Sequence, residues 1–146
     1  MASGFSIYTA NRLLDKQFRR VDFTPESTVY AGLFKNASAA GYLRSGDVAS
    51  AQEVLTAGGT LYARVPITLT GGTAFSVAAS GHTENAAEIV FPQAGASWGT
   101  VYTVALMDVA TVNTGNVIVY ADLPASKVIG SPDVPKIPIY YFDIYI

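Results

Sequence analysis

The sequence contains no cysteine, one histidine and few charged residues. Without cysteine the chain forms no disulfide and offers no thiolate for catalysis or metal binding, which agrees with assembly in a reducing cytoplasm. Charged residues make up only 14% of the chain, against about 25% in ordinary soluble proteins. So little charge favours a surface that is partly buried in an assembly, although a well-covered sandwich is the simpler alternative.

Long apolar runs are also missing. No stretch approaches the roughly 20 apolar residues of a membrane helix, and the first residues lack the basic and apolar regions of a signal peptide. We therefore expect no membrane partner. A net charge of −2 argues against a nucleic-acid partner. The 146 residues, half of them hydrophobic, predict a single domain over 1–146 with a sizeable core.

The single histidine restricts catalytic and metal chemistry. A metal could contact two of His82, Glu84 and Glu88, but these residues straddle a loop and a strand start, whereas protein metal sites need convergent ligands. A Ser-His-Asp catalytic triad would need His82, and no serine lies in a Gly-x-Ser-x-Gly turn. We predict no catalytic, cofactor-binding or metal-ligating residues and no enzymatic activity.

An amphipathic helix is predicted over 6–19, with Ser6 as its N-cap. Its apolar stripe packs against the sheet or a neighbouring molecule. Residues 1–20 carry a net charge of +3 and the other 126 residues −5. The basic side chains fall away from the stripe and either dock on an acidic partner or form a solvated face. These candidate partner-binding residues are Arg12, Lys16, Arg19 and Arg20.

A first strand over 28–34 is followed by a segment rich in alanine, serine and glycine over 35–60. We predict a long loop there, with a possible short helix over Val48–Leu55 capped by Ser45 or Asp47. Connections of this length are often functional. The segment is therefore a candidate contact loop, with Tyr42 and Arg44 as candidate partner-binding residues.

Alternation of apolar and polar residues predicts a half-buried strand over 61–70, with Leu61 on its buried face and Pro66 marking an edge or a bulge. Gly71-Gly72 then predicts a hairpin turn with a return strand over 73–78. Ala87, Ile89 and Phe91 alternate in the next strand, which Pro92 ends.

The stretch 85–109 organises the predicted fold. Trp98, between Gly95 and Gly99, is expected at a corner between two sheets. Residues 101–109 are apolar on both faces, which predicts a central strand covered on both sides. The two faces are Val101, Ala105 and Met107 on one side, and Tyr102, Val104 and Leu106 on the other.

The rest of the chain adds a hairpin turn over 113–116, strands over 117–122 and 127–129, a loop over 130–138 and a last strand over 139–146. In that last strand Tyr141 and Tyr145 face away from Phe142 and could cover a neighbour's edge. The predicted fold is all-β, a jelly-roll-like β-sandwich of seven to eight strands with one N-terminal α-helix.

Two acidic residues, Asp108 and Asp143, interrupt apolar strands. Buried or half-buried carboxylates are normally hydrogen-bonded. We expect each to lie at a strand end, or to pair with Arg64 or with a backbone amide.

Packing residues along the chain resemble a family of small virion proteins of tailed bacteriophages, variously labelled tail fibre, virion structural or capsid decoration (cement) proteins. The similarity extends from about Ser6 to Leu123. It is carried by Asn11-Arg12-Leu13-Leu14-Asp15, Phe18, Val29–Phe34, Leu61–Val65, Phe91-Pro92, Ala94, Ala96–Val101, Leu106, Asp108 and Ala110.

The resemblance implies a non-enzymatic virion protein made in the host bacterial cytoplasm. The preferred role is capsid decoration, in which a homo-oligomer, by resemblance a trimer, lies on the capsid exterior and bridges major capsid proteins. A tail fibre or adhesion component that recognises a host surface glycan is the alternative. A glycan-active enzyme is a third reading, and no catalytic constellation supports it.

Overall fold

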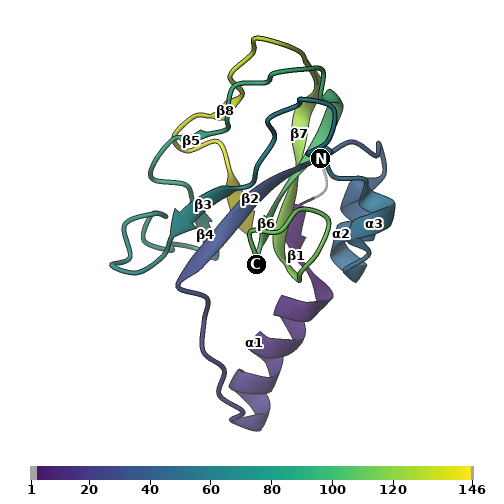
Figure 1. Ribbon diagram of the computed structural model, residues 1–146. Helices are drawn as coiled ribbons and strands as arrows, with labels where there is room; N and C mark the ends of the chain where they lie inside the picture. The colour runs from purple at the N-terminus through teal and green to yellow at the C-terminus, as the bar shows by residue number, and fades with distance from the viewer. Residues whose placement is uncertain (1–2, 146) are drawn as a thin grey trace.

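A five-stranded antiparallel sheet forms the centre of the protein (Figure 1). The computed structural model describes residues 3–145. The strand order is β1-β7-β6-β2-β3, so β3 and β1 lie at the edges. The strands of this sheet are β1 (Ser3–Phe5), β2 (Thr28–Phe34), β3 (Val65–Thr68), β6 (Gly99–Met107) and β7 (Val117–Ile129).

Two short ribbons lie beside the large sheet (Figure 1). One pairs β4 (His82–Glu84) with β9 (Asp143–Tyr145), and the other pairs β5 (Ile89–Val90) with β8 (Lys136–Ile137). The all-β prediction is therefore confirmed. The jelly-roll arrangement stays a prediction, because the described strands form one large sheet and two-stranded ribbons.

The central strand β6 is covered on both faces, as predicted. Val104 faces the cluster that contains Trp98 and Phe142, whereas Ala105 and Met107 face the cluster formed by the short helices. The prediction for Val101 is wrong, since this residue packs with Val104. The reason is a bulge: the register with β7 shifts between Val101 and Thr103, which reverses the faces of the residues before it.

The segment 35–60, predicted as a long loop with one short helix over Val48–Leu55, contains two helices, α2 (Ala39–Ser45) and α3 (Val48–Ala51). Gly46 ends α2 in the left-handed conformation at a φ of 87°, and Asp47 caps α3 by accepting from the Ser50 amide at 3.0 Å. The expected cap at Asp47 is thus confirmed, but the helix is shorter than expected. Both helices cover one face of the sheet with apolar side chains: Ala39, Ala40, Leu43, Val48 and Ala51.

The opposite face of the sheet packs around Trp98, which is fully buried. Its indole Nε1 donates to the Thr60 carbonyl oxygen at 2.7 Å, and its ring packs in a T-shaped arrangement with the Tyr62 ring, 5.2 Å between centroids. The hydrogen bond satisfies the polar end of a large apolar side chain. Trp98 therefore fastens the segment before β3 to the start of β6.

The strand predicted over 61–70 differs most from the structure. Leu61 is 66% exposed, whereas Tyr62 and Arg64 are buried. Leu61 has a positive φ of 59°, so the alternation is interrupted there and β3 begins only at Val65. Pro66 does lie on an edge strand, as expected. The predicted return strand over 73–78 is wrong, since this stretch makes one isolated bridge, between Phe75 and Asn85.

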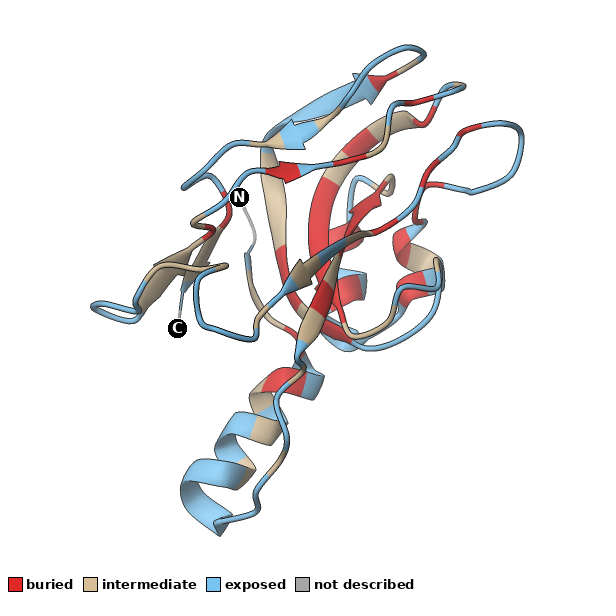
Figure 2. Cartoon of the chain, turned by 60° about the vertical axis from the view of Figure 1, so that its left-hand side comes forward, coloured by how far each residue is buried: buried red, intermediate tan, exposed pale blue. Residues whose placement is uncertain are grey.

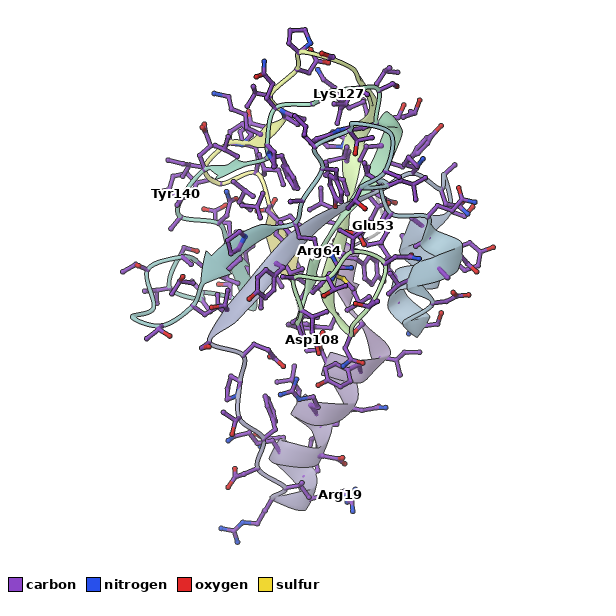
Figure 3. The ribbon with its side chains drawn as sticks, in the orientation of Figure 1. Arg19, Glu53, Arg64, Asp108, Lys127 and Tyr140 are labelled. Carbon is purple, nitrogen blue, oxygen red and sulfur yellow. The ribbon has the colours of Figure 1, made fainter. Side chains whose placement is uncertain are left out.

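A buried ion pair explains why Arg64 points inward (Figure 3). Its Nε and Nη2 donate to the two carboxylate oxygens of Glu53 at 2.8 and 2.7 Å. The same carboxylate accepts from the Tyr62 hydroxyl at 2.8 Å and the Asn113 amide at 2.7 Å. The guanidinium also donates to carbonyl oxygens of the β6–β7 connection, those of Val109 and Thr114. Every hydrogen-bonding atom of the carboxylate is satisfied, as a buried charge requires.

The two aspartates also find partners. Asp108 accepts from the backbone amide of Asn116 at 2.7 Å. Of the predicted partners, it therefore has a backbone amide and not Arg64, which binds Glu53. Asp143 contacts His82 at 3.0 Å. The strand predicted over 139–146 is shorter, because Tyr140 takes a positive φ of 66° and β9 starts at Asp143. Ile146 lies outside the described residues.

Candidate interaction surface

The helix α1 (Ile7–Arg19) projects from the body of the protein (Figures 1 and 2). Ser6 caps it, as predicted, by accepting from the Thr9 amide at 3.2 Å, and the Ser6 hydroxyl donates to the Val117 carbonyl of β7. Thr9 is the buried residue of the helix, so the first turn joins the body and the rest extends outward. No helix among residues 3–145 is long and apolar enough to cross a membrane.

The basic face of α1 is occupied by the chain that follows it. Arg12 forms an ion pair with Glu26 at 2.6 Å, donates to the Thr24 carbonyl at 3.0 Å and stacks on the Phe23 ring at 4.2 Å. Lys16 pairs with Asp22 at 3.0 Å. These contacts hold the returning segment along the helix, so α1 and residues 20–27 form one arm.

The end of α1 is less tightly bound. Arg19 pairs with Asp15 one turn earlier at 3.1 Å, in an exposed pair that contributes little to stability. Arg20 caps the helix in the left-handed conformation, and its side chain has no ion pair among residues 3–145. Residues 1–26 hold four basic and three acidic side chains, a net charge of +1. The arm as a whole is thus less basic than the helix sequence indicates.

The outer face of α1 carries an uncovered apolar stripe. Ile7, Leu14 and Phe18 are 45%, 54% and 77% exposed. With Asn11, which is also exposed, they are separated by four, three and four residues, the spacing of a coiled-coil seam. Since an α-helix has 3.6 residues per turn, Phe18 and Thr9 lie on opposite sides of it. The stripe therefore points away from the body and is available to another molecule.

The other candidate residues lie in separate places. Tyr42 and Arg44 are exposed on α2, on the helical face of the sheet. Tyr141 is exposed and lines a cavity on the opposite face, and Tyr145 stacks on the His82 ring at 4.7 Å. The structure therefore does not bring the eight candidates into one patch, and their role in partner binding stays a prediction.

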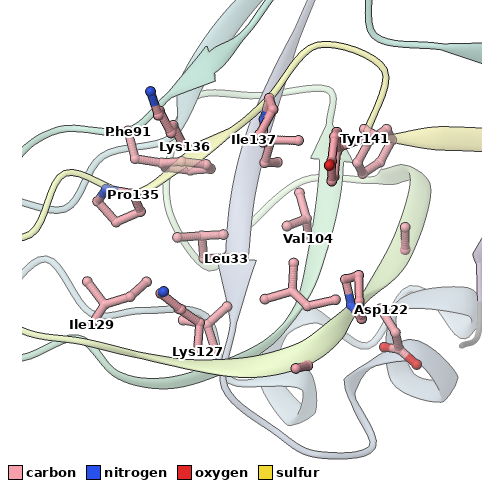
Figure 4. A pocket seen from close by; sticks show the side chains of 17 residues that line it. Leu33, Phe91, Val104, Asp122, Lys127, Ile129, Pro135, Lys136, Ile137 and Tyr141 are labelled. Atoms are coloured by element: carbon pink, nitrogen blue, oxygen red, sulfur yellow. The ribbon is translucent and has the colours of Figure 1, made fainter.

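The cavity at Tyr141 opens between β7 and the segment 135–138 (Figure 4). It measures about 290 Å³. Leu33 and Val104 lie at its floor, and charged groups such as Asp122 and Lys127 belong to its wall. Asp122 is already hydrogen-bonded, since it accepts from Thr103 at 2.6 Å. The lining is that of an incompletely covered core, with no convergent set of catalytic groups.

Three possible metal ligands meet at the β4–β9 ribbon. His82 Nε2 lies 3.0 Å from Asp143 Oδ1 and 3.8 Å from Glu84 Oε2. The sequence pointed to His82 and Glu84 but offered Glu88 as the third group. Glu88 instead faces Lys136 at 3.4 Å. Asp143 could not be identified from spacing, because the strand pairing that brings it near His82 joins residues 61 positions apart.

No curated protein sequence matches the chain. A family model described as "Podophage GP4 fiber I protein gp80" matches residues 4–144, nearly the whole length. The match confirms the predicted kinship with small virion structural proteins of phages. The chain therefore belongs to the Gp80 family of podophage fiber I proteins.

Proposed function

We propose that this protein is a non-enzymatic structural subunit of a podophage tail fibre, and that copies of it associate through the exposed stripe of α1. The family description supports a fibre component. The observation that carries the assembly step is the stripe itself, since Leu14 and Phe18 remain exposed on a helix that points away from its own body. Exposed apolar groups arranged in this way are typical of protein interfaces.

A second copy of the same chain suits this stripe because coiled-coil spacing is self-complementary. Burial of Ile7, Leu14 and Phe18 contributes up to about 1.5–3 kcal/mol for each side chain. Asn11 occupies a seam position, where a polar residue fixes register and oligomer number at some cost in stability. An isolated helix of this length would be marginal in water, but the contacts of Arg12 hold α1 in place before assembly. The family resemblance favours three copies.

The assembly is tested with Leu14→Glu combined with Phe18→Glu, which places charges in the seam. Val77→Glu is the matched control, since Val77 is 93% exposed but lies outside α1. Light scattering and sedimentation should show an oligomer for the wild type and the control and a monomer for the double variant. Circular dichroism checks that all three proteins remain folded. A wild type that is monomeric at high concentration, or an oligomeric double variant, would contradict the proposal.

Capsid decoration is the second candidate, with the major capsid protein as partner. It is favoured by Arg20 and Arg44, exposed cations for which no ion pair occurs among residues 3–145. Capsid exteriors are often acidic, so Arg19→Glu with Arg20→Glu should weaken attachment through lost attraction and new repulsion. Stripped particles are mixed with each protein, and occupancy and heat resistance are measured. Equal rebinding by the variant would contradict docking through this helix.

Cryo-electron microscopy of intact particles distinguishes the two placements, because density on the tail supports the fibre and density over the capsid supports decoration. A fibre that recognises a host glycan would use exposed aromatic rings, which present an apolar face and a hydroxyl group. Three exposed tyrosines fall within residues 140–145: Tyr140, Tyr141 and Tyr145. Binding to host cells by the wild type and by Tyr141→Ala tests this role.

A further inference from the structure

We propose that His82, Glu84 and Asp143 bind a divalent transition-metal ion that fastens the C-terminal strand β9 to β4. One ligand atom from each residue lies within 4.8 Å of the other two. His82 and Glu84 come from β4, and Asp143 comes from β9. The site is distant in sequence from the α1 seam and does not depend on the assembly proposed above.

Two negative charges face each other on the β4–β9 ribbon, an arrangement that a bound cation would stabilise. Glu84 and Asp143 are directly opposite each other in the antiparallel pair. Two like charges in this position destabilise a strand pair. Neither carboxylate has a lysine or arginine partner among residues 3–145. A bound cation would turn this repulsion into a link between the two strands.

The distances fit a small metal ion. Bonds of about 2.0–2.1 Å from zinc to nitrogen and oxygen place neighbouring ligands of a tetrahedral site roughly 3.4 Å apart. The separations from His82 Nε2, 3.0 Å to Asp143 and 3.8 Å to Glu84, lie on either side of that value. A single imidazole with two carboxylates suits zinc and its neighbours in the first transition row. Calcium is disfavoured, because it takes oxygen ligands.

The site is partly formed before an ion arrives. The His82 ring stacks on Tyr145 with 21° between the ring planes, which limits its rotation. At the other end of the ribbon, the Asn85 side chain accepts from the Phe142 amide at 2.8 Å and the Tyr141 amide at 3.1 Å. All three ligand side chains are partly exposed, so an ion can enter and a water molecule can complete the coordination.

The ion would matter for the end of the chain because the ribbon is short. Each of its strands has three residues, and a two-stranded pair of that length is marginal in water. Binding to the folded form alone raises stability by mass action. The structure therefore links metal occupancy to the order of the C-terminal strand and of the exposed Tyr145 on it.

The test uses full-length protein freed of metal with a chelator and then titrated with zinc chloride at neutral pH. Calorimetry should show one ion per chain, and cobalt chloride should give the visible absorption of a low-coordinate site. Zinc should also raise the melting temperature and slow amide hydrogen exchange in residues 143–145. His82→Gln and Asp143→Asn should each lose at least about tenfold in zinc affinity, since each removes a ligand.

Glu88→Gln is the matched control, because it removes a neighbouring carboxylate that pairs with Lys136. It should bind zinc as the wild type does. Wild-type protein that takes up no more zinc than His82→Gln would overturn the site, and so would an equal loss in Glu88→Gln. Two results together would also reject the metal site: Asp143→Asn is more stable than the wild type without zinc, and cobalt gives no visible absorption. The three side chains would then form only a cluster of repelling charges.

Discussion

The buried ion pair between Glu53 and Arg64 offers the sharpest test of how the core is held together. Both side chains are fully buried. Arg64→Leu keeps apolar bulk but leaves the Glu53 carboxylate with two donors, the Tyr62 hydroxyl and the Asn113 amide. Breaking a buried pair in this way costs about 3–5 kcal/mol, a large part of the roughly 5–15 kcal/mol that stabilises a domain.

Urea unfolding measures this loss. With a slope of about 2 kcal/mol per molar urea, the midpoint should fall by about 2 M for Arg64→Leu. Arg64→Lys keeps the charge but loses the planar fork that contacts both carboxylate oxygens. Its urea midpoint should therefore lie between those of the wild type and Arg64→Leu. Arg44→Leu, at an exposed arginine on α2, should change little. A free energy of unfolding for Arg64→Leu within about 1 kcal/mol of wild type would refute the reasoning.

Three further predictions concern the same core. Trp98→Ala should cost about 3–5 kcal/mol in denaturant melts, because a buried ring and its bond to Thr60 are lost; an exposed emission spectrum for wild-type Trp98 would contradict it. Burial, and then the charge of Glu53, raise the pKa of Tyr62 well above 10.0. The native state then keeps a proton that the unfolded chain releases, so the free energy of unfolding should fall as the pH rises above 10.0, and Tyr62→Phe should reduce that fall. Gly95→Ala should cost about 1–3 kcal/mol in thermal melts, since its methyl group would collide with the Gly59 carbonyl oxygen; an unchanged melting temperature would show that this loop adapts freely.

Local sequence determined the elements whose signals are short-ranged. The Ser6 cap and apolar spacing were enough to place α1, and β2 occurs at the predicted residues. The continuous apolar run before Met107 identified a strand buried on both faces. In each case the signal arises from neighbouring residues, through capping or through side-chain periodicity.

The alternation from Leu61 to Leu69 gave a misleading result because a single backbone conformation reversed it. With Leu61 in the left-handed region, Tyr62 and Arg64 turn inward. Their inward position depends on Glu53, whose carboxylate is brought there by the helical segment that precedes it. Periodicity carries no information about a charged partner that arrives from another element, so only the assembled core could decide which face was buried.

The candidate sites divide in the same way. Sequence alone determined that α1 has one apolar and one basic face. The fold decided that Arg12 and Lys16 of the basic face pair with residues 22–26, and that the apolar face is left open. His82 and Glu84 were visible as neighbours in the chain, whereas Asp143 joins them only through the pairing of β4 with β9. Local sequence patterns determine which side chains a helix or strand presents on each face. The long-range contacts of the tertiary structure determine which of these side chains come together.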